Sequence, residues 1–494
     1  MLLNELLSEI PDSGFASHPD VEIRDITYDS RRAKDGDLFV AIRGQKTDGS
    51  AFVAQAAARG AVAAAMEQEP EAPAGIPIVR VKDAREFLAR AARVLFHDPA
   101  ARLRLAAVTG TNGKTTTTYL LESVFREAGY RALLVGTTGM RIGNQEVPSE
   151  RTTPEAADLM RFLQKAIQGG CTHGALEVSS HALVLKRVFG THFEVGVFTN
   201  LTQDHLDFHG DMESYYRAKK TLFMPEGDNA IRTAVVNSDD PYGRRLASEI
   251  GVRVVRAGFG EDADIRVVHS DYGVDGTNVE VATPAGSTAI RLRLLGRPNV
   301  YNALSTVGAA LGLGFGLDVI RRGIEALPGV PGRMEPVHAG QRFLVLVDYA
   351  HTPDALEKML ATALTLPHGR LITVFGCGGD RDRGKRPLMG EIAARMSDHV
   401  VATSDNPRSE DPQKILAEIA IGLKKGESSF ELVPDRREAI GIAVARAGPE
   451  DVVVIAGKGH EAYQVIGDRA FPFDDRSVAR EMILRLTGAQ ANRN

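Results

Sequence analysis

Short apolar runs that end in small or polar residues recur along the middle of the chain, with helix-forming stretches between them. After "LAAVTG" at residues 105–110, the runs are "RALLVGTTG", "THGALEVSS", "FEVGVFTN" and "TAVVNSDD". Strands that alternate with helices predict an α/β fold with a mostly parallel sheet. Such sheets bind ligands at the carboxyl ends of their strands, so we expect the chemistry at the polar residues that end each run.

This pattern changes twice, which divides the chain into three parts. Before Asp98-Pro99, short β-like runs such as "VEIRDITYDS", "GDLFVAI" and "IPIVRV" alternate with an alanine-rich helix. Residues 263–296 predict antiparallel hairpins, and the prolines of "LPGVPGRMEPV" then break any continuous helix. The βα pattern restarts in "FLVLVDYAHTP", "RLITVFGCGGD", "HVVATSDNPR" and "DVVVIAGKGH". A length of 494 residues suits about three domains, and we predict them at residues 1–100, 101–332 and 333–494.

Composition and charge exclude several classes of protein. The net charge of -5 provides no basic surface for nucleic acid or for a membrane. The alanine-rich stretches are shorter than the roughly 20 apolar residues of a membrane span, and the N-terminus has no cationic start typical of a signal peptide. Cys171 and Cys377 are far apart, which indicates neither a disulfide framework nor a zinc site. We expect a cytoplasmic monomer with no nucleic-acid partner and no membrane insertion.

The stretch "LAAVTGTNGKTTTTYLLESVFREAG" predicts a strand, a glycine-bearing loop and an amphipathic helix. A standard Walker A loop would have glycine at the position of Val108, so the loop from Gly110 to Thr115 is shorter. Its glycines still allow backbone N–H groups to approach phosphates at a helix N-terminus. Lys114 would contact the β- and γ-phosphates, and Thr115 would bind Mg²⁺. The alternative is a simple glycine turn, but the strand before it and the helix after it favour a phosphate loop.

Two residues at later strand ends are candidates for binding a second metal ion. Glu177 ends "THGALE", and His205 lies in "FTNLTQDHLDFHG", which follows another apolar run. Hard cations prefer oxygen ligands, and a phosphoryl-transfer site uses a second metal to hold the transferring group. A single Glu or His at such a place is usually a hydrogen-bonded loop residue. The position of both at the same predicted sheet edge as Lys114 favours metal binding.

Taken together, the motifs resemble those of the Mur ligases over essentially the whole chain. They are "TGTNGKTTT", "EVSSH", "FTNLTQDHLDFHGDMESY", "GRPNVYNALS", "PGRME", "VDYAHTPDAL", "GCGGDRDRGKRPLM", "SDNPR" and "GKGHE", and they occur here in the family's order. Within the family, the resemblance is strongest to the ligases that add meso-diaminopimelate. It implies a three-domain architecture: an N-terminal domain that binds UDP, a P-loop-type central domain that binds ATP, and a Rossmann-like C-terminal domain that brings the amino acid.

The resemblance assigns binding roles to residues that would otherwise look ordinary. The family's "DSR" matches Asp29 to Arg31, and its following loop contacts uridine and diphosphate. The residues implied to bind the UDP substrate are Ser30, Gln45, Lys46, Thr47, Thr152, Thr153, Ser179 and Arg187. Leu185 departs from the pattern, because relatives often have Gln there. Those implied to bind ATP are Gly110, Thr111, Asn112, Gly113, Lys114, Thr115, Thr116, Asn299, Asn302, Arg333, Asp348 and His351.

The resemblance also implies Mg²⁺, with two ions expected, and a modified lysine. In the family a carbamylated lysine bridges the second metal, and Lys219 of "YYRAKKTLF" matches it, next to Lys220. An uncharged lysine amine can capture CO₂ and become an anionic oxygen ligand. The implied metal ligands are Thr115, Glu177, His205 and Lys219, and the implied catalytic residues are Lys114, Lys219 and His205.

The motif "SDNPR" indicates which amino acid is added. Diaminopimelate differs from lysine by a carboxylate at its far end, and Arg408 offers a planar cation that can bind this group. The alternative is an Asn-Pro turn whose arginine pairs with Glu410 or Asp411. The residues implied to bind diaminopimelate are Arg381, Asp405, Asn406, Pro407, Arg408, Gly457 and Glu461, with Glu461 suited to the distal ammonium.

The implied reaction is ATP-driven amide formation. The γ-carboxylate of D-Glu in UDP-MurNAc-L-Ala-D-Glu would attack the γ-phosphoryl group, and the amine of meso-diaminopimelate would displace phosphate from the acyl phosphate. A P-loop kinase or a nucleotide switch could share "GTNGKT" but would not need a third βα domain. A folylpolyglutamate synthetase, or the ligase that adds D-Ala-D-Ala, shares the ATP core but would lack "SDNPR" together with "GKGHE".

Overall fold

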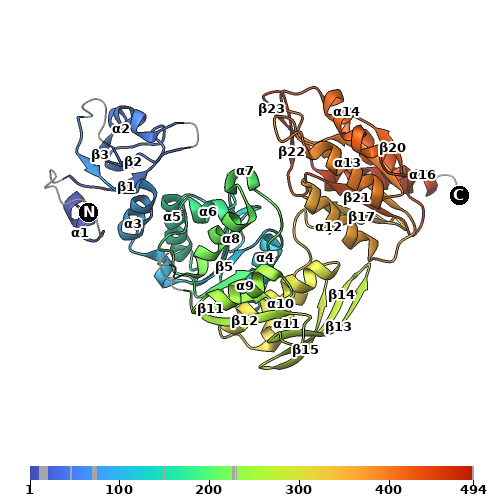
Figure 1. Ribbon diagram of the computed structural model, residues 1–494, viewed down its shortest axis with the longest axis horizontal. Coiled ribbons are helices and arrows are strands. Elements are labelled where there is room, and N and C mark those ends of the chain that lie inside the picture. Colours follow the sequence, from blue (N-terminus) through green and yellow to red (C-terminus); the bar gives the residue numbers. More distant parts are fainter. Residues whose placement is uncertain are drawn as a thin grey trace. The chain divides into compact units, whose positions relative to one another are not determined.

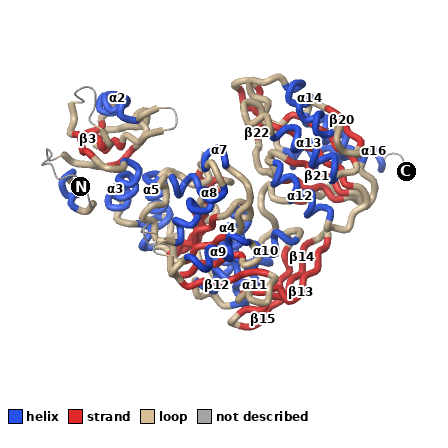
Figure 2. The backbone as a smooth tube through the Cα atoms, in the orientation of Figure 1, coloured by secondary structure: helices blue, strands red, loops and turns tan. Residues whose placement is uncertain are grey.

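The computed structural model describes residues 1–10, 21–44, 47–68, 75–149, 151–224, 229 and 231–491. They form two compact units, Met1–Arg266 with Leu304–Gly323, and Val267–Ala303 with Ile324–Asn494. Figures 1 and 2 show the elements of each unit. Within the described part of the chain, none of the helices combines the length and the apolar character that crossing a membrane requires.

The first unit begins with a small four-stranded sheet of parallel strands in the order β1-β2-β3-β4. Its elements are α1 (Leu3–Ser8), β1 (Asp25–Thr27), β2 (Asp37–Val40), a 3₁₀ turn (Gly49–Phe52), α2 (Val53–Ala58), β3 (Ala61–Met66), β4 (Ile78–Arg80), α3 (Ala84–Leu95) and a second 3₁₀ turn (Pro99–Arg102). The alanine-rich stretch is therefore part helix and part strand. Gly60, with φ +108°, separates α2 from β3 and turns the chain back toward the sheet.

The main sheet of the first unit contains the strands predicted from the apolar runs. Its elements are β5 (Arg104–Thr109), α4 (Lys114–Glu127), β6 (Ala132–Gly136), β7 (Gly139–Ile142), β8 (Gln145–Val147), α5 (Ala156–Gln168), β9 (His173–Glu177), α6 (Ser180–Val184), β10 (Val195–Phe198), α7 (Leu206–His209), α8 (Met212–Lys220), a 3₁₀ turn (Thr221–Phe223), β11 (Thr233–Asn237), α9 (Pro241–Glu249) and β12 (Arg253–Gly258). Strands β12-β11-β10-β5-β9-β6 pair in parallel in that order, whereas β7 and β8 continue the sheet as antiparallel strands. The predicted parallel sheet is confirmed.

The residues predicted to form hairpins do so. β13 (Ile265–Gly273) pairs through its first two residues with β12, and β14 (Gly276–Thr283) pairs antiparallel with β15 (Gly286–Leu292). The chain then continues through α10 (Arg297–Gly312) and α11 (Leu317–Ala326).

The second unit contains a six-stranded sheet in the order β16-β17-β21-β18-β19-β20. Its elements are β16 (Glu335–Pro336), β17 (Leu344–Asp348), α12 (Pro353–Leu364), β18 (Leu371–Cys377), α13 (Lys385–Met396), β19 (His399–Ser404), α14 (Pro412–Leu423), β20 (Ser429–Leu432), α15 (Arg436–Arg446), β21 (Val452–Ala456), β22 (Tyr463–Ile466), β23 (Arg469–Pro472) and α16 (Asp475–Ala491). Strands β17 to β21 are parallel, as the restarted βα pattern predicts, whereas β16 pairs antiparallel with β17.

Helices cover both faces of this sheet. Leu344 and Leu346 of β17 belong to one apolar cluster with α12, α13 and α14, whereas Val345 and Val347 belong to a second cluster with α15 and α16. Figure 1 shows α12, α13 and α14 on one side of the strands. Because successive side chains of a strand point to opposite faces, a strand buried on both faces is apolar at every position. The polar residues that follow each strand therefore lie at the carboxyl edge of the sheet, outside the apolar core.

Candidate active site

The predicted phosphate loop connects β5 to α4 at the carboxyl edge of the main sheet. Gly110 (φ +143°) and Gly113 (φ +85°) both have left-handed backbones, and a Cβ atom on Gly110 would lie 1.9 Å from Thr199 Oγ1. Helix α4 begins at Lys114, so its first N–H groups and its partial positive charge lie at the end of the loop. The loop therefore has the construction that phosphate binding requires.

The end of the neighbouring strand β10 holds this loop in place. Thr111 N donates to Asn200 O (2.9 Å), and Asn112 N donates to Asn200 Oδ1 (3.0 Å). Thr199 Oγ1 donates to Asn112 O at 2.6 Å. Thr199 and Asn200 were not singled out from the sequence. They could have been found from the predicted neighbourhood of the two strands, because β10 pairs with β5 in parallel.

Two lysines meet at a single carbonyl group of the loop. Lys114 Nζ donates to Gly110 O (3.0 Å) and to Thr111 O (2.7 Å), and Lys219 Nζ donates to the same Gly110 O at 2.8 Å. Lys219 is only 1% exposed. Burial, and then the charge of Lys114, hold the pKa of the Lys219 amine well below its usual value. This shift favours the neutral amine of Lys219 beside the phosphate loop.

Glu177 lies at the same edge, at the end of β9, which pairs with β5. It is fully buried, and its carboxylate accepts hydrogen bonds from Thr137 N (2.9 Å) and Thr137 Oγ1 (3.0 Å). Gly136 permits this approach, because a Cβ atom there would lie 2.3 Å from Glu177 Oε1. Hydrogen bonds from Thr137, and not an ion pair, thus set the position of the Glu177 carboxylate in these contacts.

His205 precedes α7 and has a left-handed backbone, with φ +52°. Its Nε2 lies 3.4 Å from Asp204 Oδ2, and its ring centroid lies 4.8 Å from that of His181. Burial lowers the pKa of His205; the carboxylate of Asp204 opposes this shift, and the charge of Lys114 adds to it. A neutral imidazole is the form of histidine that binds metal ions.

These residues fit a magnesium site only if Lys219 becomes an anion. Among the described residues, no group of three or more His, Cys, Asp or Glu side chains could hold a metal ion. Glu177 supplies one carboxylate, Thr115 a hydroxyl and His205 an imidazole, whereas Mg²⁺ prefers oxygen ligands. A carbamate on the buried Lys219 amine would supply a second anionic oxygen ligand.

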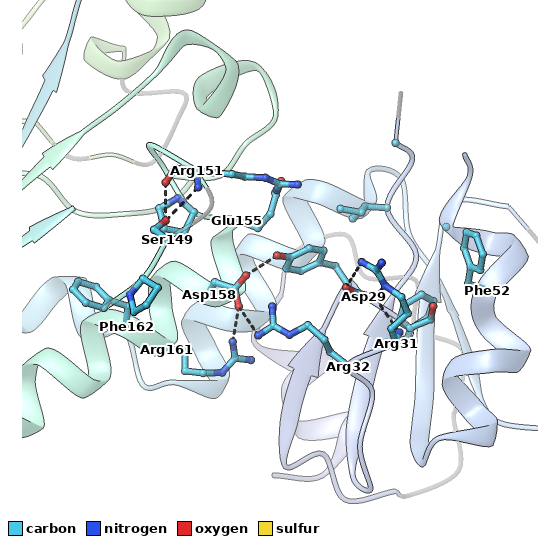
Figure 3. A pocket seen from close by; sticks show the side chains of 18 of the residues that line it. Asp29, Arg31, Arg32, Phe52, Ser149, Arg151, Glu155, Asp158, Arg161 and Phe162 are labelled. Carbon is cyan, nitrogen blue, oxygen red and sulfur yellow. Dashed lines mark hydrogen bonds and ion pairs between the residues drawn. The ribbon is translucent and has the colours of Figure 1, made fainter. Parts of the chain in front are cut away.

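A large cavity lies elsewhere in the first unit, between the small sheet and α5. Its volume is about 970 Å³, and Ser30, Thr47, Arg31, Arg151 and Glu155 are among its lining residues. Figure 3 shows Asp29, Arg31 and Arg32 on one wall and Arg151, Glu155, Asp158 and Arg161 on the other. Of the described residues that line it, five are cationic and three are carboxylates, an excess that suits an anionic diphosphate. Gln45 and Lys46 lie outside the described residues.

The other residues predicted to bind the UDP substrate gather near the end of β9. Thr153 Oγ1 donates to Glu177 O (2.8 Å) and accepts from Ser179 N (3.2 Å). Thr152 Oγ1 lies 3.2 Å from Thr137 Oγ1. Arg187 donates to Thr153 O (3.2 Å) and to Glu155 Oε1 (3.0 Å), which links this group to the cavity wall. The structure therefore brings these four predicted residues together.

In the second unit, the predicted nucleotide residues lie at two places. Asn302 Nδ2 donates to Asn299 Oδ1 (3.0 Å), and Asn299 Nδ2 donates to Leu295 O (2.8 Å), both at the start of α10. Asp348 ends β17 and accepts hydrogen bonds from Met334 N (2.7 Å) and Ala350 N (2.8 Å). The guanidinium of Arg333 lies over the ring of Tyr349, whose carbonyl lies 2.8 Å from His351 Nδ1. Arg333, Asp348 and His351 thus share one strand end.

The predicted amino-acid site lies where β18, β19 and β21 end. Asn406 Nδ2 donates to Glu461 Oε2 (3.1 Å), and a Cβ atom on Gly457 would lie 2.7 Å from Asp405 Oδ2. Asp405, Asn406 and Glu461 are thus adjacent. Arg381 follows β18 in the loop opposite Pro407, where Pro407 O lies 1.9 Å from a Cβ placed on Gly379.

The guanidinium of Arg408 is turned toward this site. Its backbone is left-handed, with φ +51°, and its Nη1 donates to Gly379 O at 2.8 Å. Glu410 binds Arg386 instead (2.8 and 2.9 Å), and Asp411 caps α14. The alternative of a turn in which Arg408 pairs with Glu410 or Asp411 does not match these contacts.

A pairing with the β22–β23 hairpin sets the position of the "SDNPR" segment. Arg408 N donates to Val465 O (3.1 Å), and Gly467 N donates to Arg408 O (2.8 Å). Val465 N donates to Asn406 Oδ1 (2.9 Å), and Gln464 Nε2 donates to Asp405 O (2.7 Å). Gln464 and Val465 were missed in the sequence, since a short, half-exposed hairpin gives a weak hydrophobic signal.

The fold and the phosphate loop define a nucleotide-binding α/β protein that also contains a second, six-stranded sheet. Three family models match the chain: the Mur ligase family catalytic domain over residues 22–95, the Mur ligase middle domain over 108–310, and the Mur ligase glutamate ligase domain over 332–459. The chain belongs to the Mur ligase family and has its three-domain α/β architecture, as the sequence predicts.

Similar proteins cover almost the whole chain. A UDP-N-acetylmuramoyl-L-alanyl-D-glutamate--2,6-diaminopimelate ligase of Geobacter metallireducens is 45% identical, over 96% of this chain and 97% of its own. The ligase of the same name in Solibacter usitatus is also 45% identical, over 98% of each chain. A solved structure of a ligase of this name is 35% identical, with a TM-score of 0.71 and 99% of each chain covered. A folylpolyglutamate synthase of Mycobacterium tuberculosis, at 17% identity and a TM-score of 0.61 over 80% of this chain and 94% of its own, shares the fold.

Proposed function

We propose that this chain is an ATP-dependent ligase that joins meso-2,6-diaminopimelate to the D-Glu γ-carboxylate of UDP-MurNAc-L-Ala-D-Glu in peptidoglycan precursor synthesis. The observation that carries the proposal is the cluster of Asn406, Arg408 and Glu461 at one sheet edge, in a chain of this family. Relatives that carry this activity in their names are 45% identical over nearly the full length. We infer that the protein works in the cytoplasm.

In the first step, the phosphate loop positions ATP for attack by the substrate carboxylate on the γ-phosphorus, which forms an acyl phosphate and releases ADP. The residues from Gly110 to Thr116 would surround the phosphates, and the Lys114 ammonium would offset the charge that spreads over the γ-phosphoryl oxygens. Thr115, Glu177, His205 and a carbamate on Lys219 would hold Mg²⁺. The metal, when bound, neutralises phosphate charge and aligns the phosphate oxygens. We infer two ions, as the resemblance to the Mur ligases implies.

The UDP end of the substrate is assigned to the cavity beside α5. Ser30 and Thr47 line this cavity, and its arginines would bind the diphosphate. Thr152, Thr153, Ser179 and Arg187 would guide the peptide toward the carboxyl edge, where the phosphate loop lies. Gln45 and Lys46 are assigned to the same end of the substrate.

In the second step, the amine of the amino acid displaces phosphate from the acyl phosphate. Asp405, Asn406, Pro407, Gly457, Arg381 and Glu461 would hold the amino acid, and Arg408 would bind its distal carboxylate. Asn299, Asn302, Arg333, Asp348 and His351 are assigned to the nucleotide. Positioning of the reactants supplies most of the catalysis, because an acyl phosphate is already activated toward an amine.

Phosphate release separates this function from a nucleotide switch or a kinase. A ligase should release phosphate from ATP efficiently only when both the UDP-sugar peptide and the amino acid are present. A switch would hydrolyse ATP without either of them, and a kinase would transfer phosphate to the peptide without the amino acid. Steady-state phosphate release with each substrate omitted in turn distinguishes the three.

Arg408→Ala should lose about tenfold or more in kcat/KM for meso-diaminopimelate. A charge-assisted bidentate contact contributes about 1.5–3 kcal/mol, and 1.4 kcal/mol corresponds to a factor of ten. Arg437→Ala is the matched control, because Arg437 is an exposed arginine of the same unit that pairs with Glu481. If Arg408→Ala kept the preference of the wild-type protein for diaminopimelate over L-lysine, the role given to this arginine would be wrong.

A further inference from the structure

Lys458 is a buried lysine that the roles assigned above do not use. It follows β21 in "GKGHE", and its side chain is 0% exposed. Its Nζ donates to Asn406 Oδ1 and to Glu461 Oε2, both at 3.1 Å. Burial of an ammonium group is costly unless the group is paired and hydrogen-bonded. The buried ammonium of Lys458 is therefore stabilised by Asn406 and Glu461, which are both residues of the proposed amino-acid site.

The contacts of Lys458 determine which way the amide of Asn406 points. Asn406 Oδ1 accepts from Lys458 Nζ and also from Val465 N at 2.9 Å. An ammonium and a backbone N–H can only donate, so the oxygen of the amide must face them. The nitrogen must then face Glu461 Oε2, to which it donates at 3.1 Å. If the amide were flipped, its NH₂ group would face Lys458 Nζ and Val465 N, which are themselves donors, and neither could form a hydrogen bond with it.

This orientation leaves defined groups for a ligand. An amide nitrogen carries two hydrogens, and the bond to Glu461 uses one of them. Lys458 and Asn406 both donate to Oε2 of Glu461. The other carboxylate oxygen, Oε1, is the acceptor that a ligand would use. One N–H donor and one carboxylate oxygen are thus presented side by side, which is the pair of groups that would bind a carboxylate and an ammonium of an amino acid.

We propose that Lys458 is a positioning residue for the amino-acid substrate. It fixes the Asn406 amide and the Glu461 carboxylate, so that the second N–H and Oε1 meet the incoming zwitterion. This inference rests on the proposed function. The alternative is an ion pair that only stabilises the fold, and such a pair would not distinguish one substrate from another.

The test replaces Lys458 by methionine, which has a similar length and no charge. In the full-length protein, Lys458→Met should raise the KM for meso-diaminopimelate about tenfold or more, which corresponds to the loss of one oriented, charge-assisted contact. The KM values for ATP and for UDP-MurNAc-L-Ala-D-Glu should stay near those of the wild type. Lys424→Met is the matched control, because Lys424 is an exposed lysine of the same unit, and it should change none of the three.

A second comparison applies if the unpaired, half-buried carboxylate of Glu461 prevents folding of the single variant. Lys458→Met/Glu461→Gln leaves no unpaired charge in the pair. Compared with Glu461→Gln alone, it should raise the KM for diaminopimelate by a further factor of about three, because Asn406 loses the donor that orients it. This factor is smaller than in the single variant, since the effect through Glu461 is already gone.

Three results would overturn the inference. They are an unchanged KM for diaminopimelate in folded Lys458→Met, an equal rise in the KM values of all three substrates, and equal KM values in the double variant and Glu461→Gln. Failure of the proposed function is separate, because it would show as a wild-type protein that does not ligate diaminopimelate at all.

Discussion

Replacement of Lys114 by alanine should abolish ligation while the chain stays folded. The Lys114 ammonium lies on the phosphate loop, where it donates to the carbonyls of Gly110 and Thr111. Its charge would be needed on the phosphates as negative charge moves toward the γ-phosphoryl oxygens. Loss of one such preorganised group costs on the order of 10²–10³ in kcat. Ligation rates at saturating substrates, together with thermal unfolding of the variant, measure both parts of this prediction.

Arg126→Ala is the matched control for this variant. Arg126 lies on the same helix α4 but near its C-terminal end, where it is exposed. It should leave the rate unchanged. Near-normal turnover by Lys114→Ala would contradict the assignment of this loop to the nucleotide.

Lys219→Ala should also lose most activity, and short carboxylic acids added to the assay should restore part of it. The Lys219 amine is 1% exposed and lies at Gly110 O beside Lys114. Burial, and then the charge of Lys114, hold its pKa well below the usual value, which favours the neutral amine that reacts with CO₂. Alanine at position 219 would remove the carbamate oxygens, and a small carboxylate could take their place.

Lys220 provides an internal control for this prediction. It is the next residue in the chain, but its Nζ pairs with Glu249 Oε2 at 2.9 Å rather than with the loop. Lys220→Ala should therefore retain activity and show no response to added acids. A mass measurement that found an unmodified Lys219 amine in the ATP complex, together with a fully active Lys219→Ala, would refute the carbamate.

The hydrophobic pattern predicted the sheets because their central strands are buried on both faces. β5, β9 and β10 are continuous apolar runs, and the structure pairs them side by side. Among the strands that were not predicted, β20 and the β22–β23 hairpin are short and partly exposed, so their side chains carry little pattern. The helix predicted for the alanine-rich stretch is wrong in its second half, because alanine fits both helix α2 and the buried strand β3.

The candidate site was predictable wherever a local motif carries its own chemistry. The glycines and Lys114 of the phosphate loop have this property, and the structure gives the loop the expected geometry. The lowered pKa of Lys219 depends on burial and on Lys114, which is more than a hundred residues away in the chain, so the local sequence could not indicate it. Asn200 and Lys458 act through contacts with distant segments, and only the folded chain shows these contacts.

The incorporation of radiolabelled amino acid into UDP-MurNAc-L-Ala-D-Glu tests the central claim most directly. Purified protein, ATP and Mg²⁺ would be incubated with the UDP-sugar dipeptide and either labelled meso-diaminopimelate or labelled L-lysine. We predict ATP-dependent incorporation of diaminopimelate at least about tenfold more efficient than that of lysine, because Arg408 has no carboxylate to bind in lysine. Equal use of the two amino acids, or no incorporation of diaminopimelate, would contradict the account.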